Sequence, residues 1–316
     1  MTEFRTIRDA DLPRIASVKN AVNASAGFAL MTTEQELDEE FSFPYVDRMR
    51  DVFCAVDDGE VVGYAHTYFV DSTELEVKCF IFGGTHPDHT SRGIGTALTN
   101  LAVERAQELL ATGTEGLPRR LRAVSISGQD DSEQLLGSLG FTPVRWFSEM
   151  SRPLEDLPAL VTPEGITIKP WDTSRSAELR DAKNAAFEDH WGSTPTAPEG
   201  WIQMTEGWGS RPDVSYMAVD GEDRIVGLLL THRYPDDDIL LGGSYGWIDK
   251  IATVRRMRGR GVASALIARA LHAYAEQGWT HGAIDVDADN PSGAFGLYGS
   301  LGFVPFRGTV IHELPL

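Results

Sequence analysis

A glycine turn flanked by arginines gives this sequence its clearest chemical signal. Residues 258–261 read Arg-Gly-Arg-Gly, between an alternating apolar run at 247–254 and a run with helical spacing that starts at Ala263. The first run predicts a half-buried strand, and the second predicts a helix that ends near Gly278. Glycine lets a backbone approach a phosphate closely, and the unpaired N–H groups of a helix's first turn attract anions. The segment therefore predicts a phosphate-binding turn.

A tyrosine downstream of this turn could act as an acid. Tyr298 lies late in a short helix that we expect from Pro291 to Ser300, with Asn290 as N-cap and Gly302 as a left-handed C-terminal cap. A phenol, with a reference pKa of about 10, can protonate a departing thiolate, whose own pKa is about 8.5. An ordinary core aromatic is the alternative role. The glycine turn before it favours the acid.

These features together resemble the GNAT superfamily of N-acetyltransferases. The motif R-x-x-G-x-A at 258–263 is similar to that family's pyrophosphate loop, R/Q-x-x-G-x-G/A, and residues 284–290 resemble its next strand and asparagine. The helix with Tyr298 and the turn at 301–303 follow as they do in the family. The resemblance covers nearly the whole chain and implies acetyl-CoA as co-substrate.

The resemblance also implies which residues hold acetyl-CoA. The end of the strand would pair with the pantetheine arm, and a backbone N–H there would polarise the thioester carbonyl. The glycine turn and the first helical residues would hold the pyrophosphate. The implied contacts are Ile251, Ala252, Thr253, Val254, Arg258, Gly259, Arg260, Gly261, Val262, Ala263, Ser264, Asn290 and Ser292.

Acetyl transfer to an amine also needs a group that takes the amine's proton. Asp249 is our candidate, because it lies two residues before Ile251 and so on the same face of the strand. A solvated carboxylate at a strand end is the alternative. His232, Asp189 and His190 compete for the role, because members of the family that this chain resembles use different groups here.

Acidic and aromatic residues between 182 and 211 mark a candidate acceptor site. Carboxylates beside aromatics would suit an amine that carries positive charge. Trp201, Met204 and Trp208 have helical spacing there, which favours a core face over an aromatic wall for the acceptor. The candidate acceptor contacts are Glu188, Asp189, His190 and Trp191.

The chain repeats its own layout. Gly-Ser-Leu-Gly-Phe occurs at 137–141 and again at 299–303, an offset of 162, and the glycine turn at 92–95 answers residues 260–263. Each half reads as strand, helices, a run of strands, glycine turn with helix, strand, short helix and strand, which predicts an α/β (α+β) fold. We therefore expect two tandem GNAT-type domains, each a mixed, mostly antiparallel sheet flanked by helices.

A proline-rich stretch separates the two expected domains. They would span 1–154 and 166–316, with a linker at 155–165. Leu136 stands in the first half where the second has Tyr298, so the first domain is predicted to be catalytically degenerate and the second to be the catalyst. The first domain keeps its glycine turn, and a second acetyl-CoA site would comprise Arg92, Gly93, Ile94, Gly95 and Thr96.

Composition limits the partners and the compartment. A formal charge of −19 at pH 7 and a pI near 4.8 argue against nucleic acid or an anionic membrane as partner. Cys54 and Cys79 fall in strand-like apolar runs, so we expect reduced thiols and assign no metal. The sequence has no evident leader or membrane-spanning run, which predicts a cytoplasmic protein. The oligomeric state is open, and tandem domains are compatible with a monomer.

The resemblance implies an acetyl-CoA-dependent N-acetyltransferase that acetylates a primary amine of a small molecule by direct attack in a ternary complex. The layout is also similar to that of the mycothiol synthases, tandem GNAT enzymes with a degenerate first domain, which would make the acceptor a cysteinyl amino-sugar conjugate. A non-enzymatic acetyl-CoA sensor is a third reading, but it needs no acid such as Tyr298. A Rossmann-type nucleotide site is disfavoured, because the third glycine of G-x-G-x-x-G is missing.

Overall fold

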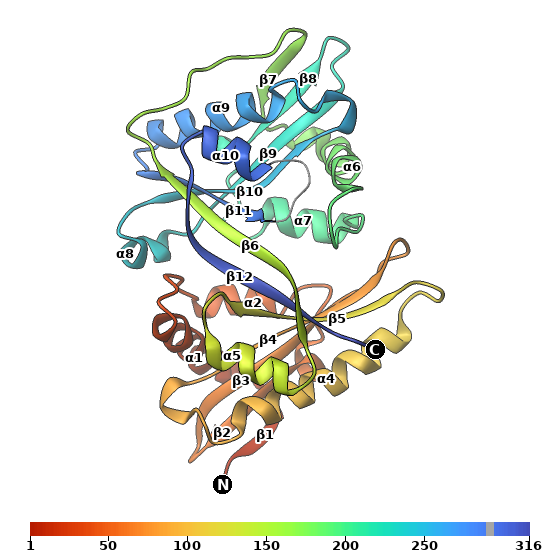
Figure 1. Cartoon of the computed structure of the whole chain (residues 1–316), viewed down its shortest axis with the longest axis vertical. Helices are drawn as coiled ribbons and strands as arrows, with labels where there is room; N and C mark the ends of the chain where they lie inside the picture. Colours follow the sequence, from red (N-terminus) through yellow and green to blue (C-terminus); the bar gives the residue numbers. More distant parts are fainter. Residues whose placement is uncertain (289–293) are drawn as a thin grey trace. The chain divides into compact units, whose positions relative to one another are not determined.

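The computed structural model describes residues 1–288 and 294–316, and the chain divides into two compact units (Figure 1). Unit 1 comprises Met1–Trp146 with Gly308–Leu316, and unit 2 comprises Phe147–Arg307. In each unit helices flank a sheet whose described strand pairs are antiparallel except for one parallel pair. The predicted α/β (α+β) class, with two mixed and mostly antiparallel sheets, is confirmed.

Unit 1 has the strand order β1-β2-β3-β4-β5-β12, with β4 and β5 parallel. Alternate residues of β3 face different helices, since Tyr64 packs in one cluster with Ile15 of α1 and Ala65 in another with Leu98 of α4. The helices α1 and α4 therefore cover opposite faces of the sheet. The elements are β1 (Glu3–Thr6), α1 (Leu12–Ser25), α2 (Glu34–Glu40), α3 (Arg48–Asp51), β2 (Val52–Asp57), β3 (Glu60–Val70), β4 (Val77–Thr85), α4 (Ile94–Thr112), β5 (Arg119–Ile126), α5 (Asp130–Ser138) and β12 (Val304–Leu314) from residue 308.

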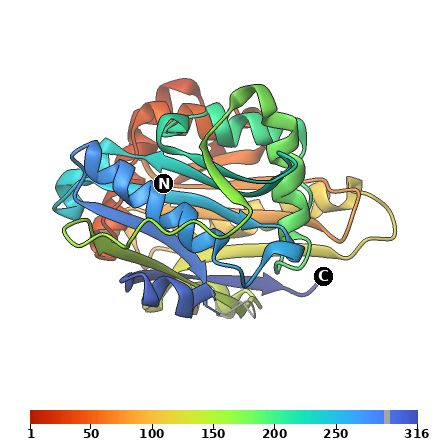
Figure 2. The ribbon, with the colours of Figure 1, turned by 90° about the horizontal axis from the view of Figure 1, so that it is seen from above.

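Unit 2 has the strand order β6-β11-β10-β9-β8-β7, with β10 and β11 parallel. Leu228 of β9 packs with Leu179 of α6, and the next residue, Leu229, packs with Leu266 of α9. Consequently α6 and α9 cover opposite faces of this sheet; in Figure 2 α6 is green and α9 is blue. The elements are β6 (Thr142–Pro153) from residue 147, β7 (Ile166–Pro170), α6 (Ser176–Phe187), α7 (Pro198–Glu206), β8 (Tyr216–Asp220), β9 (Ile225–Arg233), α8 (Asp238–Leu241), β10 (Tyr245–Thr253), α9 (Val262–Glu276), β11 (His281–Asp287) and α10 (Ala294–Ser300).

The repeat seen in the sequence reappears in the backbone. Gly93 and Gly261 are the N-caps of α4 and α9, with φ of 77° and 82°. Gly140 and Gly302 follow α5 and α10, with φ of 89° and 85°. Only glycine adopts this left-handed region at low cost, so the predicted left-handed cap at Gly302 is confirmed.

The two halves of the chain exchange their last strands. β6 ends the first half of the sequence, yet it pairs antiparallel with β11 of unit 2, with Glu149 opposite Asp285. β12 ends the second half, yet its residues 309–314 pair antiparallel with β5 of unit 1. Figure 1 shows β6 in yellow-green and β12 in dark blue. The compact units thus contain different residues from the sequence halves 1–154 and 166–316.

The expected stripe of Trp201, Met204 and Trp208 is partly wrong. Trp201 is 2% exposed and packs with Leu179, and Met204 packs against the same cluster, so the core interpretation is confirmed for these two. Helix α7 ends at Glu206, so Trp208 does not belong to the helix and is 36% exposed.

The two cysteines are free and buried in separate strands, Cys54 in β2 and Cys79 in β4. Burial raises the pKa of Cys54 to about 11 and that of Cys79 to about 12, so both thiols stay protonated. They are structural, as expected. Among the helices that the structure describes, none has the length and apolar character needed to cross a membrane.

Candidate active site

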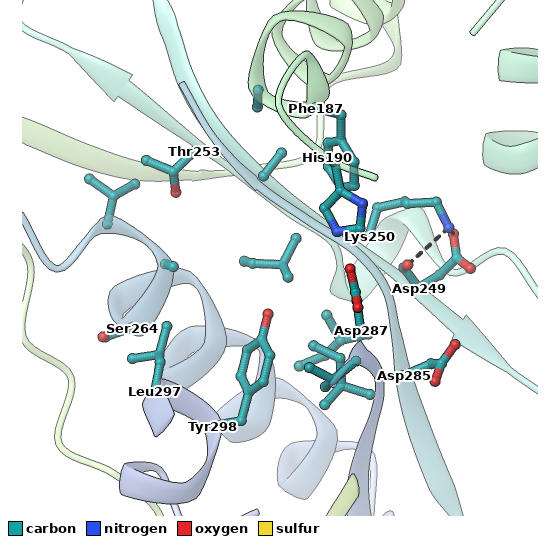
Figure 3. Close-up of a pocket in the computed structure, with 18 of the residues that line it drawn as sticks. Phe187, His190, Asp249, Lys250, Thr253, Ser264, Asp285, Asp287, Leu297 and Tyr298 are labelled. Atoms are coloured by element: carbon teal, nitrogen blue, oxygen red, sulfur yellow. Dashed lines mark hydrogen bonds and ion pairs between the residues drawn. The ribbon is translucent and has the colours of Figure 1, made fainter. Parts of the chain in front are cut away.

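Unit 2 contains a cavity of about 870 Å³ (Figure 3). Its walls come from β10 at 248–253, the start of α9 at 261–264, and β11 at 284–287. The end of α6 with the loop after it, and α10 with Tyr298, complete the lining. The cavity therefore brings together the predicted phosphate turn, the predicted acid and the predicted base.

The cavity opens where two parallel strands part. Within the described chain, β10 and β11 pair only over Tyr245–Ile248 and His281–Ile284. A β-bulge at Asp249 shifts the register of β10 against β9, and these two strands stay paired as far as Thr253. The backbone of 250–253 therefore has one side paired with β9 and the other side turned to the cavity. This is the strand end at which the family resemblance implied the thioester; that role stays a prediction.

The glycine turn stands at the head of α9. Gly259 and Gly261 have φ of 71° and 82°, and an added Cβ at Gly259 would meet no atom within 4 Å. Ala265 N–H donates to Gly261 O at 3.0 Å, the first bond of the helix, and the N–H groups before it lack intrahelical partners. An open, left-handed turn before a helix of 15 residues fits a pyrophosphate.

The arginine that leads the turn is held by the end of α6. Arg258 Nη1 donates to Asp189 Oδ2 at 2.8 Å, and its Nη2 donates to Ala186 O at 2.6 Å. Ala186 lies in the last turn of α6, where helix carbonyls lack partners and attract cations. Arg255 Nη1 adds a contact of 3.6 Å to Asp189 Oδ1. Asp189, which the sequence suggested as an acceptor contact, thus holds the arginine that leads the glycine turn.

Tyr298 has an apolar body in the core and a polar end in the cavity. The residue is 6% exposed, and its ring meets Phe303 edge-on at 6.3 Å between centroids. Figure 3 shows the hydroxyl directed into the cavity. Burial raises the pKa of Tyr298 to about 12, so the phenol carries its proton at neutral pH. The core role weighed from the sequence is confirmed, and the acid role stays a prediction.

Asp249 lines the cavity beside a lysine. Lys250 Nζ donates to Asp249 Oδ2 at 3.0 Å (Figure 3). Burial raises the pKa of Asp249, but the charges of Lys250 and His232 outweigh burial and leave it below its ordinary value. The carboxylate is therefore anionic at neutral pH and holds a proton weakly.

Strand β11 adds two carboxylates to the same wall. Asp285 and Asp287 lie on the same face of β11 and both line the cavity; Asp287 is 4% exposed, and Asp285 is the more exposed of the two. Burial raises the pKa of Asp285, an effect that Lys250 only partly offsets. Carboxylates thus extend along the wall from Asp249 to Asp287.

Next to Asp285, across the pairing of β11 with β6, lies a buried ion pair between Glu149 and Arg307. Glu149 of β6 stands directly opposite Asp285, and Arg307 Nε donates to Glu149 Oε2. The Arg307 guanidinium also lies 5.6 Å from the ring centroid of Trp247, which lines the cavity. Burial, together with Asp285 and Asp237, raises the pKa of Glu149 to about 7 in spite of Arg307.

Most of the predicted acetyl-CoA contacts line the cavity. Val254 instead belongs to the core at 7% exposure, and Arg260 Nη1 contacts Met257 Sδ at 3.3 Å. Asn290 and Ser292 lie outside the described residues. The predicted contacts that line the cavity are Ile251, Ala252, Thr253, Arg258, Gly259, Gly261, Val262, Ala263 and Ser264.

The acceptor candidates divide into two pairs. Asp189 and His190 line the cavity, whereas Glu188 is the exposed C-cap of α6 and, like Trp191, is not among the lining residues. Sequence reasoning singled out none of Phe147, Phe187, Tyr234, Trp247, Lys250, Asp285 and Asp287 as site residues, and all of them line the cavity. A signal for the two aspartates existed in their alternation with Ile284 and Val286.

The glycine turn of unit 1 is packed differently. Arg92 Nη2 donates to Asp57 Oδ2 at 2.7 Å. A Cβ at Gly95 would lie 3.2 Å from Leu135 Cδ2, so a leucine approaches this turn closely. A second acetyl-CoA site at Arg92, Gly93, Ile94, Gly95 and Thr96 stays a prediction.

The family comparison agrees with the repeat and the cavity. The model of the Acetyltransferase (GNAT) family matches the chain twice, at residues 17–141 and 177–303. The chain therefore belongs to the GNAT acetyltransferase family as a tandem of two domains, and it is an acyltransferase. The resemblance found in the sequence is confirmed.

Curated relatives and solved structures align with most of this chain. The chain is 30% identical over 262 residues to a mycothiol acetyltransferase of Nocardia farcinica, covering 78% of this chain and 77% of the relative. A mycothiol acetyltransferase of Thermomonospora curvata is 27% identical, with 83% and 81% covered. A GCN5-related N-acetyltransferase from Sphaerobacter thermophilus superposes with a TM-score of 0.79 at 24% identity, covering 99% of this chain and 95% of the other. A tandem GNAT protein from the clavulanic acid biosynthesis pathway gives 0.74 at 17%, covering 99% and 98%. At these identities the structures show a shared fold alone.

Proposed function

We propose that unit 2 transfers an acetyl group from acetyl-CoA to a primary amine of a small molecule within a ternary complex. One observation carries the proposal: a single cavity is lined by the glycine turn at Gly261, the open strand end at 251–253 and the Tyr298 hydroxyl. These groups suit, in turn, the pyrophosphate, the thioester carbonyl and the departing thiolate.

The reaction needs three proton transfers, and a C–N bond forms as a C–S bond breaks. The acceptor ammonium loses a proton, and the free amine nitrogen bonds to the thioester carbonyl carbon while a backbone N–H of 251–253 stabilises the oxygen. The C–S bond then breaks, and Tyr298 gives its proton to the sulfur and regains one from the new amide nitrogen. The elevated pKa of Tyr298 keeps the phenol protonated at neutral pH.

The base assigned from the sequence, Asp249, stays a prediction. Its position at the bulge suits the role, because the carboxylate lines the cavity next to the open strand end. Its ion pair with Lys250 and its lowered pKa suit it better to hold an ammonium than to accept a proton.

The wall of carboxylates supports a cationic acceptor. Asp249, Asp285 and Asp287 line the cavity with the aromatic rings of Trp247 and Phe187. A second candidate acceptor is a cysteinyl amino-sugar conjugate, because relatives named mycothiol acetyltransferase align with this chain over most of both lengths.

We propose further that unit 1 is catalytically inactive. Leu136 occupies in α5 the place that Tyr298 occupies in α10, since Phe141 N–H donates to Leu136 O at 3.0 Å and Phe303 N–H donates to Tyr298 O at 3.0 Å. A leucine has no proton to give. Whether the glycine turn of unit 1 holds acetyl-CoA is tested in the same experiment.

The test combines calorimetric titration of acetyl-CoA with an assay of CoA release over a panel of amines that includes a cysteinyl amino sugar. We expect tight binding, turnover of at least one amine, and a loss of about 100-fold in kcat for Tyr298→Phe at unchanged acetyl-CoA affinity. One bound acetyl-CoA per chain would place the ligand in one unit, and two would support the second site. Full turnover by Tyr298→Phe would contradict the acid role, and no binding would refute the proposal.

A further inference from the structure

A histidine and a buried aspartate face one another in the wall of the cavity. Figure 3 shows His190 and Asp287 pointing toward each other, on the side of the cavity across from Tyr298. His190 comes from the loop after α6, and Asp287 ends β11, so the fold joins segments far apart in the sequence. An imidazole oriented by a carboxylate is a common arrangement for proton transfer.

Local contacts fix the position of His190. The backbone N–H of His190 donates to Phe187 O at 2.9 Å, and the backbone N–H of Ser193 donates to His190 O at 3.0 Å, so the loop turns tightly at the end of α6. The His190 ring also lies 5.1 Å from the Phe187 ring, tilted by 35°. Asp287 is only 4% exposed and pairs in register with Phe147. Both groups are thus held at the cavity wall.

The other histidine of the cavity is engaged on both sides. His232 Nε2 lies 2.8 Å from Met204 O, and its Nδ1 lies 2.9 Å from the Tyr234 hydroxyl. Its ring is therefore committed to structural contacts. His232 serves as a matched control for His190.

The charges around His190 set its expected behaviour. Figure 3 shows the Asp287 carboxylate aimed at the imidazole, whereas Asp249 is paired with Lys250 and Asp189 with Arg258. A neighbouring carboxylate favours the imidazolium, the form that His190 would adopt after accepting a proton. The titratable and charged groups that line the same cavity are Asp189, His232, Tyr234, Asp249, Lys250, Arg258, Asp285, Asp287 and Tyr298.

We propose that His190 accepts the proton of the acceptor ammonium and that Asp287 positions its imidazole. The inference rests on the proposed function and names the base of that reaction. The acceptor R–NH₃⁺ gives one proton to His190, which passes it to water. The resulting R–NH₂ forms the C–N bond, and its second departing proton replaces the one that Tyr298 gave to the CoA sulfur. R–NH–acetyl and CoA–SH are the products, so protons and bonds balance.

The pH dependence of kcat/KM tests the proposal with three variants and a control. An acceptor amine with a pKa above about 9 keeps its own titration away from that of an imidazole, whose reference pKa is about 6.5. We expect an acid limb in the wild type, and His190→Gln should remove that limb and lower kcat/KM by about 100-fold at neutral pH. Asp287→Asn should keep the limb but move it to lower pH, because the carboxylate that favours the imidazolium is gone. Asp249→Asn should raise the acceptor KM and retain the limb, and His232→Gln should retain it as well.

Three outcomes would overturn the inference. One is a wild-type acid limb that survives in His190→Gln, and another is its loss in Asp249→Asn alone. The third is an Asp287→Asn profile identical to the wild type, which would remove the positioning role. Acetyl-CoA titration and thermal melts of every variant separate these outcomes from misfolding. If the wild type itself bound no acetyl-CoA, the proposed function would fail and the base assignment with it.

Discussion

Replacing Gly261 by alanine should weaken acetyl-CoA binding far more than it weakens the fold. Gly261 has φ of 82°, where an L-residue costs about 1–2 kcal/mol. The added Cβ would meet Pro163 Cγ at 3.6 Å, an ordinary contact, so the structural cost is the backbone term alone. A loss of this size lowers Tm by about 2–8 °C in a domain of this size. The methyl group would, however, stand where a phosphate must approach the turn.

The expected loss of affinity follows from the hydrogen bonds at the turn. If the methyl displaces the phosphate from two N–H groups, and a bond to a charged group contributes about 1.5–3 kcal/mol, Kd should rise by about 100-fold or more. Gly93→Ala is the matched control, because Gly93 has φ of 77° and an added Cβ there would meet nothing within 4 Å. Calorimetry and melting curves of both variants check the reasoning. Equal Tm losses with an unchanged Kd for Gly261→Ala would refute the phosphate assignment.

Three further predictions follow from contacts described above. Asp189→Asn removes a carboxylate from Arg258, so it should raise the KM of acetyl-CoA more than that of the acceptor; the reverse result in steady-state kinetics would favour a direct acceptor role for Asp189. Burial raises the pKa of Glu149 in the folded protein to about 7, above its unfolded value of about 4.3. The contribution of Glu149 to stability is therefore fully present below a pH of about 4.3 and is lost as the pH rises toward 7. Glu149→Gln should flatten this dependence by about 3 kcal/mol, measured by urea unfolding between pH 4.5 and 7.5, and an unchanged slope would contradict the pKa shift. Ending the chain after Arg307 removes 309–314 from β5, so amide exchange should accelerate in β5 of unit 1, whereas slow exchange there would mean that another segment pairs with it.

The parts of the site built from local sequence were predictable. The expected strand at 247–254 became β10 at Tyr245–Thr253, and the expected helix from Ala263 became α9 at Val262–Glu276. Glycine conformation and apolar spacing are properties of neighbouring residues, so the turn at Gly261 needed no knowledge of the fold.

The parts of the site built by strand order were not predictable. Glu149 reaches the region of Asp285 only because β6 joins the sheet of the other half, which no local pattern encodes. Likewise, the partner of Arg258 is the end of a helix about seventy residues earlier, as the separation of 72 to Ala186 shows. Periodicity shows that Asp287 shares a face with Asp285, but only the packed sheet shows that this face lines the cavity.

The exchange of β6 and β12 has a consequence for the order in which the protein can fold during synthesis. The edge of β5 is completed by residues 309–314, which are synthesised after all the other strands that the structure describes, and the contact of Ser125 Oγ with His312 Nε2 at 2.9 Å closes a loop of 187 residues. β6 emerges earlier and carries proline and arginine at the same 162-residue offset, Pro143 for Pro305 and Arg145 for Arg307. We therefore expect β6 to compete with β12 for β5 in the nascent chain, and full-length refolding to be limited by release of that non-native pairing.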